Sequence, residues 1–256
     1  MTKTIPPRNY WRDDRCAKAF WSQYEMAPYQ QLLADTTEWM NPEPGERWLD
    51  LGCGSGRLCR ALWSKSEGRL AELTGLDVAA LNARSFDKMR ESLSPPPGER
   101  LKFEAVDFSA GLPWAEADLF DGAVSGLAIQ YAESYSEAEQ RWTCDAYDRL
   151  LGDVHRVLKP GARFVFSVNV PEPSWGRVGL NAMRSIFSAQ RKMRFLGKLY
   201  GMWSYGGWLK REARKGRFHY LPAEAITSKL SAAGFAEIEY RMSFAKQAFL
   251  FRCTKR

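Results

Sequence analysis

Residues 47 to 58 read Arg-Trp-Leu-Asp-Leu-Gly-Cys-Gly-Ser-Gly-Arg-Leu, and the fold of the chain can be worked out from them. The first half is apolar and predicts a buried strand, because strands covered on both faces read as short apolar runs. Three glycines at every second position follow, and they allow a sharp turn and close approach to a ligand. Helical spacing begins at Arg57. A strand, a glycine turn and a helix in this order predict a ligand site at the end of a parallel strand.

The glycine spacing and the residue before it narrow the ligand class. A triphosphate-binding loop needs G-x-x-x-x-G-K-[ST], and this stretch lacks both the spacing and the lysine. The dinucleotide fingerprint G-x-G-x-x-G is also unmatched, because Arg57 and Leu58 stand where its last turn is tightened. The carboxylate of Asp50 would repel a pyrophosphate and favours a cationic ligand.

The run from Asp50 to Gly56 resembles motif I, [E/D]-x-G-x-G-x-G, of the class I S-adenosylmethionine-dependent methyltransferases. Within that family the chain is similar to small-molecule and lipid-type enzymes such as the ubiquinone and menaquinone biosynthesis methyltransferases. The resemblance implies S-adenosylmethionine as the cofactor. It also implies an α/β fold, a Rossmann-like seven-stranded sheet with a C-terminal antiparallel hairpin, an N-terminal helical cover and an inserted helical cap after strand five.

Composition and cysteine usage place the chain in a broad class. Its 256 residues, 45% hydrophobic and 26% charged, suit one α/β domain with or without an insertion. The sequence has no apolar run of about 18 residues, and residues 1–15 have no apolar core, so we expect neither a membrane span nor a secretion signal. The five cysteines form no C-x-x-C pair and there are two histidines, which predicts no metal site and a cytoplasmic protein.

Three further strand ends carry side chains suited to the cofactor. Asp77 lies 21 residues after Gly56, close to the ~20 typical of a ribose-binding carboxylate. Capping of the following helix is the alternative role for Asp77. By the resemblance, Asp107 binds the adenine amine, and the end of the fourth strand faces the methyl group. The predicted cofactor-binding residues are Tyr24, Asp50, Gly52, Cys53, Gly54, Gly56, Asp77, Val78, Asp107, Phe108, Ser125, Gly126 and Leu127.

The other expected elements complete the sheet and its cover. Apolar spacing predicts helices over 16–40, broken at Pro28, and over 142–158 and 222–233. The expected strands are 47–51, 70–78, 101–106, 119–126, 163–168, 237–244 and 247–254. This divides the chain into an N-terminal arm and helical cover (1–44), a cofactor-binding core (45–171), an inserted cap (172–218) and a C-terminal helix and hairpin (219–256).

The inserted segment is strongly basic. Arg177 to Arg217 contain eleven Lys or Arg and one acid, Glu212, while the whole chain has a net charge of +7. An extra segment that leaves the carboxyl end of a strand is expected to lie over the ligand crevice. Three interpretations stay open: a helical hairpin packed on the core, peripheral contact of residues 177–217 with an anionic membrane, and nucleic-acid binding, which is the least favoured.

We expect a methyltransferase acting on a small-molecule or lipid-like acceptor. Direct displacement from a sulfonium depends mainly on alignment, so no catalytic dyad is required. Relatives often carry a His where this chain has Gln130. If the acceptor must lose a proton, the candidate bases are Tyr24, Tyr29, Tyr131 and His219; packing on the sheet is the alternative for the first two. An RNA methyltransferase and a non-catalytic protein that binds S-adenosylmethionine or S-adenosylhomocysteine are the alternative functions.

Overall fold

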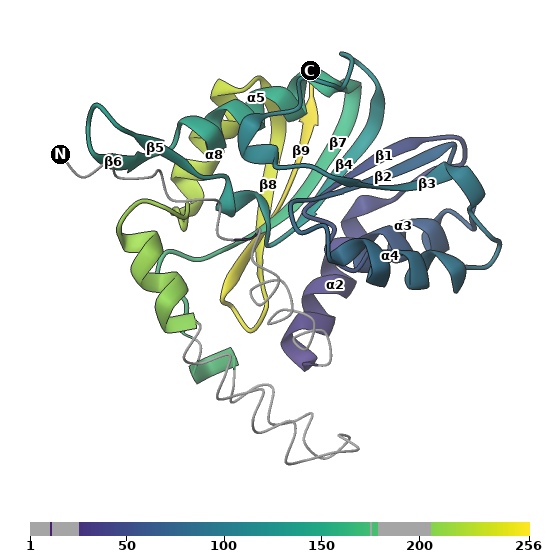
Figure 1. The fold of residues 1–256 in the computed structure, drawn as a ribbon, viewed down its shortest axis with the longest axis horizontal. Helices are drawn as coiled ribbons and strands as arrows, with labels where there is room; N and C mark the ends of the chain where they lie inside the picture. Colours follow the sequence, from purple (N-terminus) through teal and green to yellow (C-terminus); the bar gives the residue numbers. More distant parts are fainter. Residues whose placement is uncertain (1–10, 12–25, 175, 179–205) are drawn as a thin grey trace.

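The structure, a computed structural model, describes residue 11 and residues 26–174, 176–178 and 206–256. Its main feature is a seven-stranded sheet in the order β3-β2-β1-β4-β7-β9-β8 (Figure 1). The strands are β1 (Arg47–Leu51), β2 (Glu72–Asp77), β3 (Leu101–Ala105), β4 (Phe120–Gly126), β7 (Leu158–Asn169), β8 (Phe235–Ser243) and β9 (Ala248–Lys255). The expected seven-stranded α/β sheet is confirmed.

Strand direction also follows the expectation. β1 pairs in parallel with β2 and with β4, β2 pairs in parallel with β3, and β4 pairs in parallel with β7. β9 is antiparallel to both β7 and β8, which confirms the C-terminal hairpin. The chain crosses from β3 to β4 on the other side of β1, so the carboxyl ends of β1 and β4 flank the point where strand order reverses. Ligands bind at such points in open α/β sheets.

Helices cover both faces of the sheet (Figure 1). α3 (Arg57–Lys65) and α4 (Asn82–Glu91) pack with Met40 of α2 (Ala27–Met40) against one face, around the buried Trp48 and Trp63. α5 (Asp145–Val157) and α8 (Ala223–Ala232) pack against the other face, around Phe164 and Phe166. Residues 206–214 form a further helix in the cap. Short 3-10 turns occur at η3 (Gly98–Arg100), η4 (Phe108–Ala110) and η5 (Ile129–Tyr131).

The expected helix over 142–158 begins too early, and this boundary was wrong. Trp142 belongs to β6 (Arg141–Thr143), which pairs with β5 (Ser134–Ser136) in a separate antiparallel hairpin. The Ser134 hydroxyl donates to Thr143 O at 2.9 Å and accepts the Ala146 N–H at 3.1 Å, so the hairpin also supports the first turn of α5. Helical spacing alone could not show this cross-strand contact. β7, which was expected over residues 163–168, is longer than predicted and begins at Leu158, directly after α5.

The helical cover is described only from Met26 onward. Pro28 lies in the first turn of α2, where proline suits the start of a helix, and the helix predicted before it lies outside the described residues. Tyr24, which was predicted to bind the cofactor and was a candidate base, lies outside the described residues. Most of the inserted cap lies outside them as well. Within the part of the chain that the structure describes, no helix is both long enough and apolar enough to cross a membrane.

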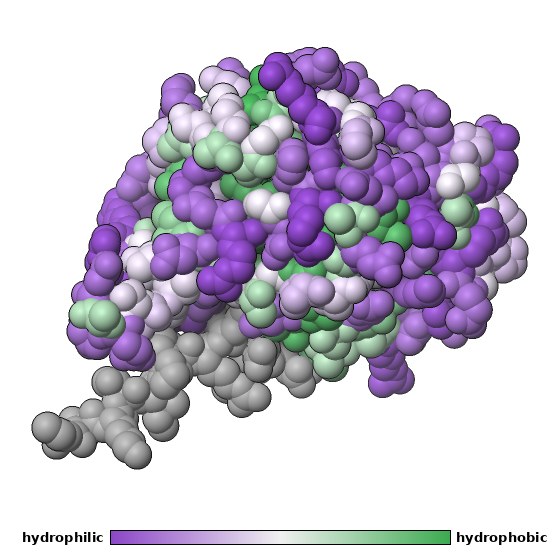
Figure 2. All heavy atoms as spheres, turned by 90° about the horizontal axis from the view of Figure 1, so that it is seen from above, coloured by the Kyte–Doolittle hydropathy of each residue, from purple (hydrophilic) through white to green (hydrophobic). Residues whose placement is uncertain are grey.

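The face seen from above in Figure 1 lies at the end where β9 finishes, and hydrophilic side chains dominate it (Figure 2). Hydrophobic residues there form small scattered groups. Because β9 runs antiparallel to β7, this is the end where β7 begins. The ligand site is therefore sought at the opposite end of the sheet, where the parallel strands finish.

Candidate functional site

The glycine turn after β1 requires its glycines. Gly52, Gly54 and Gly56 have φ values of 76°, 53° and 81°, in the left-handed region that other residues adopt at a cost. The backbone N–H groups of Gly52 and Cys53 both donate to Leu76 O at 2.8 Å. The turn is thereby fastened to the end of β2.

Packing is a second reason why two of these positions require glycine. A Cβ on Gly52 would lie 2.2 Å from the Cβ of Ala128 and 3.6 Å from Phe108, and one on Gly56 would lie 2.2 Å from Met89. Close approach of a ligand was the expected reason, whereas at these two positions protein side chains occupy the space. The contacts bring the residues after β3 and β4 against the turn, so the ends of three strands meet there.

Asp50 is fully buried beneath the turn. The Cys59 thiol donates to Oδ2 at 3.2 Å, while Oδ1 has no hydrogen-bond partner. Burial raises the pKa of Asp50 from 3.8 to about 7, and the neighbouring Asp77 adds to the rise. A carboxyl group held in this way is stabilised by a cation or a hydrogen-bond donor beside it.

Asp77 lies at the end of β2 and faces the same turn. Its Oδ2 accepts the Gly54 N–H and its Oδ1 accepts the Ala79 N–H, both at 2.8 Å. Burial raises the pKa of Asp77, although these backbone donors oppose the rise. The bond to Gly54 places this carboxylate at the ligand side of the turn, while the bond to Ala79 fits the simpler role of supporting the next loop.

The other predicted cofactor residues lie at the same end of the sheet. Asp107 accepts the Ser109 N–H at 3.0 Å and caps η4, and Val106 N donates to Asp77 O at 3.0 Å. Val78 is half-buried beside Asp77. The Ser125 hydroxyl donates to Leu51 O at 2.7 Å, so it joins the ends of β4 and β1. Their roles toward a ligand stay predictions.

Leu127, directly after β4, has a strained backbone. Its φ is 54°, a left-handed value that is unfavourable for leucine. Its N–H donates to Ser167 O at 3.1 Å and to Ser167 Oγ at 3.0 Å, which holds this conformation against β7. Residues in such conformations cluster at functional sites, and this one adjoins Ala128, which packs on Gly52.

Gln130 is buried and hydrogen-bonded to three other residues. From the sequence, it was notable only because relatives often carry a His at this position. Its Nε2 donates to Leu127 O at 3.1 Å, and its Oε1 accepts the Asn169 N–H at 2.6 Å. Its carbonyl accepts the His219 N–H at 2.8 Å. Gln130 thus joins the ends of β4 and β7 to residues 217–221, hereafter the strap.

Tyr131 packs against the strap and His219 belongs to it, but neither is placed as a ready base. The Tyr131 hydroxyl lies 3.0 Å from that of Tyr220, and burial raises the pKa of Tyr131 to about 12. His219 Nε2 is 2.8 Å from Ala132 O, so this nitrogen carries the proton, and Nδ1 faces the Cys144 thiol at 3.6 Å. Burial lowers the pKa of His219. Both groups are neutral at pH 7, and their catalytic roles stay predictions.

The third described candidate base, Tyr29, lies in a different cluster. It packs with Met26, Leu32 and Leu127, and its ring meets Phe244 edge-on at 6.1 Å. The structure therefore places Tyr131 and His219 together on the strap side and Tyr29 on the α2 side. Leu127 is the residue that links the α2 side to the glycine turn.

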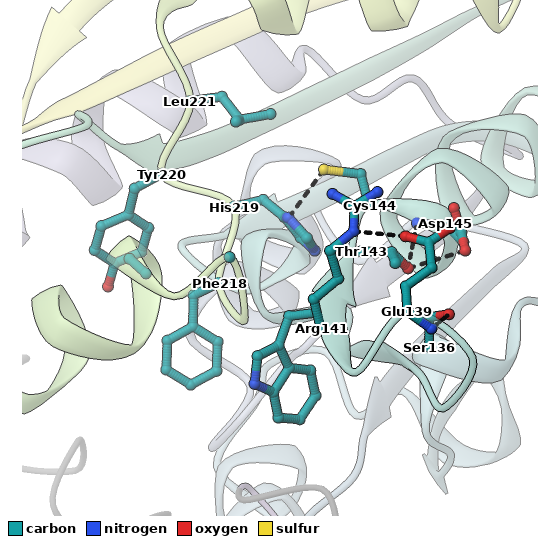
Figure 3. Close-up of a pocket in the computed structure, with 13 residues that line it drawn as sticks. Ser136, Glu139, Arg141, Thr143, Cys144, Asp145, Phe218, His219, Tyr220 and Leu221 are labelled. Carbon is teal, nitrogen blue, oxygen red and sulfur yellow. Dashed lines mark hydrogen bonds and ion pairs between the residues drawn. The ribbon is translucent and has the colours of Figure 1, made fainter.

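A pocket of about 340 Å³ lies outside the strap (Figure 3). Its lining includes Arg141, Trp142, Cys144 and His219, and no lining residue belongs to the glycine turn or to the ends of β2, β3 or β4. His219 points toward Cys144, while Tyr220 points away from Cys144 (Figure 3). This pocket is therefore separate from the glycine turn and from the strand ends that carry the predicted cofactor-binding residues.

Two residues near the candidate site, Asn169 and Tyr220, were not predicted from the sequence. Asn169 ends β7, is 2% exposed, and has a side-chain Oδ1 without a hydrogen-bond partner. Tyr220 follows His219, and its contact with Tyr131 spans 89 residues. A polar residue that ends an apolar strand, as Asn169 does after Val168, is the signal that could have found the first.

Comparison with known proteins gives one family. The family described as "Methyltransferase domain" matches residues 20–240. The biotin biosynthesis bifunctional protein BioHC of Saccharophagus degradans is 29% identical over 62% of this chain, which spans 25% of that relative. The demethylmenaquinone methyltransferase of Thermus thermophilus is 29% identical, with 75% of this chain and 74% of that protein covered.

A solved structure shows the same fold. The S-adenosylmethionine-dependent methyltransferase from Mesorhizobium loti aligns with a TM-score of 0.54 at 21% identity. The alignment covers 90% of this chain and 98% of that one. The two chains therefore share the fold over most of their length.

The buried charge of Asp50 predicts a specific pH dependence of stability. Because the pKa of Asp50 rises from 3.8 to about 7 on folding, the folded state binds this proton more tightly than the unfolded state does. The resulting stabilisation is fully present below pH 3.8, falls as the pH rises from 3.8 to about 7, and is absent above that pH. Asp50→Asn should therefore gain stability relative to the wild type between pH 4.5 and 8, by at most about 4 kcal/mol.

Urea unfolding of the ligand-free proteins at several pH values measures this difference. Asp87→Asn, at a half-exposed carboxylate paired with Arg90, serves as the matched control and should show no comparable gain. A constant difference between Asp50→Asn and the wild type across this range would contradict the buried ionised carboxylate.

Proposed function

This chain belongs to the class I S-adenosylmethionine-dependent methyltransferases, and we propose that it methylates a small aromatic acceptor at the carboxyl ends of β4 and β7. The observation that carries the proposal is the glycine turn over Asp50, whose buried Oδ1 lacks a partner. A cofactor with a sulfonium and an ammonium group supplies the positive charge that this carboxylate lacks. Because the chain spans only 25% of one relative, the activity of the whole protein is part of the proposal.

The residues at the turn fit the cofactor. In this proposal Asp50 and the turn hold the amino acid part, Asp77 binds the ribose, and Asp107 with Phe108 holds the adenine. Asp77 sits 2.8 Å from Gly54 N, and Phe108 lies against Gly52, so the binding groups adjoin one another. When bound, S-adenosylmethionine supplies an electrophilic methyl group, which is transferred as the carbon–sulfur bond breaks. The protein aligns the acceptor and excludes water, which accounts for neutral Tyr131 and His219.

Aromatic side chains support an aromatic acceptor. Tyr131, Phe218 and Tyr220 pack in one buried cluster with Leu209, and the Trp11 ring lies 4.4 Å from that of Tyr131. Flat aromatic ligands stack well against such rings. The Thermus thermophilus relative is named for demethylmenaquinone, which suggests a quinone-like acceptor here.

A second proposal is that residues 177–217 contact the surface of an anionic membrane. It rests on the basic sequence, since lipid-like acceptors reside in membranes. In the described part of the segment, however, Lys210 and Arg214 pair with Glu172, and Arg217 pairs with Glu133. These pairs reduce the free positive charge, so the membrane proposal depends on the basic residues between 179 and 205.

A transfer assay with matched variants tests the function. Wild-type protein, incubated with methyl-labelled S-adenosylmethionine and a fraction of quinone-type lipids, should give a labelled product. Asp77→Ala should lower cofactor affinity at least about tenfold, because charge-assisted hydrogen bonds to the ribose are lost. Asp121→Ala is the control, since Asp121 also accepts a backbone N–H at 2.8 Å but at the start of β4.

Calorimetry measures the affinity, and scintillation counting measures the product. Unchanged affinity in Asp77→Ala would contradict the cofactor site. Cofactor binding without transfer to any extract fraction would instead favour the non-catalytic binding role.

Liposome sedimentation tests the membrane proposal. The protein should sediment with vesicles that contain anionic lipid at low salt and be released by 0.5 M salt, because screening weakens attraction at a charged surface. Removal of residues 179–205 should abolish sedimentation. If the intact protein stays in the supernatant with anionic vesicles at low salt, the membrane proposal fails.

A further inference from the structure

The carboxyl ends of β4 and β7 carry a buried polar cluster, formed by Gln130, Tyr131, Asn169 and Tyr220. Gln130 is 0% exposed and Asn169 is 2% exposed, while the two tyrosines are at most 8% exposed. Buried polar groups of this kind normally satisfy one another. The pairing within the cluster therefore shows which polar atom the protein leaves without a partner.

Nearly every polar atom in this cluster already has a protein partner. Gln130 uses Nε2, Oε1 and its carbonyl on Leu127, Asn169 and His219. The hydroxyls of Tyr131 and Tyr220 contact each other at 3.0 Å. The side-chain Oδ1 of Asn169 is the exception among the atoms of these four described residues, because it is buried without a hydrogen-bond partner.

The position of Asn169 fits contact with an acceptor. It ends β7, the strand beside β4, and its N–H is fixed by Gln130 at 2.6 Å. The same Gln130 holds Leu127, whose neighbour Ala128 packs on Gly52 of the glycine turn. On the other side, the Asn169 side chain interacts with Tyr131, where it opposes the rise in the pKa of that hydroxyl. Asn169 therefore lies between the cofactor turn and the aromatic cluster.

An amide oxygen accepts hydrogen bonds and cannot donate them. A buried acceptor without a partner is unfavourable, and a ligand that supplies an O–H or N–H removes that penalty. A ligand that offers only an ether or carbonyl oxygen at this point leaves the penalty in place. The unpaired oxygen therefore discriminates by hydrogen-bond donation rather than by size.

We propose that Asn169 is a specificity-determining residue whose Oδ1 accepts a hydrogen bond from an O–H or N–H group on an aromatic methyl acceptor. This inference rests on the proposed methyltransferase function. The rings of Trp11, Tyr131 and Phe218 pack on one another in the same region, and the proposal places the ring of the acceptor beside this aromatic cluster. Asn169 selects the acceptor by this hydrogen bond and has no part in the transfer of the methyl group.

A matched pair of probes tests the proposal in the full-length protein. 1-Naphthol carries an O–H donor, and 1-methoxynaphthalene has the same ring without a donor. Binding of each is measured by ligand-observed NMR in the presence of S-adenosylhomocysteine. The wild type should bind 1-naphthol at least about tenfold more tightly than 1-methoxynaphthalene.

Two substitutions distinguish the contribution of the Asn169 side-chain oxygen from that of the rest of the side chain. Asn169→Leu should bind the two probes with equal affinity, whereas Asn169→Asp should keep the preference for 1-naphthol, because a carboxyl group also has an acceptor oxygen. Thermal unfolding and calorimetry with S-adenosylhomocysteine check that each variant is folded and binds the cofactor product. Methyl transfer by the wild type in the labelled assay, together with intact S-adenosylhomocysteine binding, distinguishes failure of this inference from failure of the proposed function.

Three results would overturn the inference. The first is equal affinity of the wild type for the two probes, and the second is no binding of 1-naphthol. The third is an unchanged preference in Asn169→Leu. Loss of the preference in Asn169→Asp would also count against it, because that result assigns recognition to the amide nitrogen.

Discussion

The buried carboxylate of Asp50, whose Oδ1 has no hydrogen-bond partner, is the constraint on which the site depends. It lies under a turn that three left-handed glycines form, with a second carboxylate, Asp77, bonded to the same turn at 2.8 Å. Burial raises the pKa of both groups, so the ligand-free turn holds more negative charge than its surroundings favour. A cationic cofactor removes this conflict, which connects the fold directly to the choice of ligand.

The region around Gln130, at the ends of β4 and β7, is held together by neutral hydrogen bonds. Gln130 links Leu127, Asn169 and the strap through hydrogen bonds, and it does so without any charge. A neutral, aromatic and well-connected region suits the alignment of a flat acceptor, and alignment is the main requirement for methyl transfer. The neutral state of Tyr131 and His219 agrees with this division of roles. In the proposed function, charge selects the cofactor, while shape and hydrogen bonding select the acceptor.

Local patterns made most of the fold predictable from the sequence, together with the position of the glycine turn and of Asp77 and Asp107 at the ends of neighbouring strands. Apolar runs followed by glycine or aspartate gave the strands and their ends, because parallel strands place these ends together. Contacts between distant residues could not be predicted. Arg217, counted as part of the basic segment, is buried between Glu133 and Glu212 and lies 4.8 Å from the Trp142 ring. The Ser134–Thr143 contact and the role of Gln130 likewise depend on partners that no local pattern indicates.

The most direct test of the central claim is the affinity for S-adenosylmethionine as a function of pH, measured by calorimetry between pH 5.5 and 8.5. Because a cation favours ionised Asp50, affinity should rise with pH, by up to about tenfold per unit, and level off above about 7. The same titration of Asp50→Asn accounts for ionisation of the cofactor itself and should lack this rise. Identical pH dependence in the wild type and in Asp50→Asn would contradict the account.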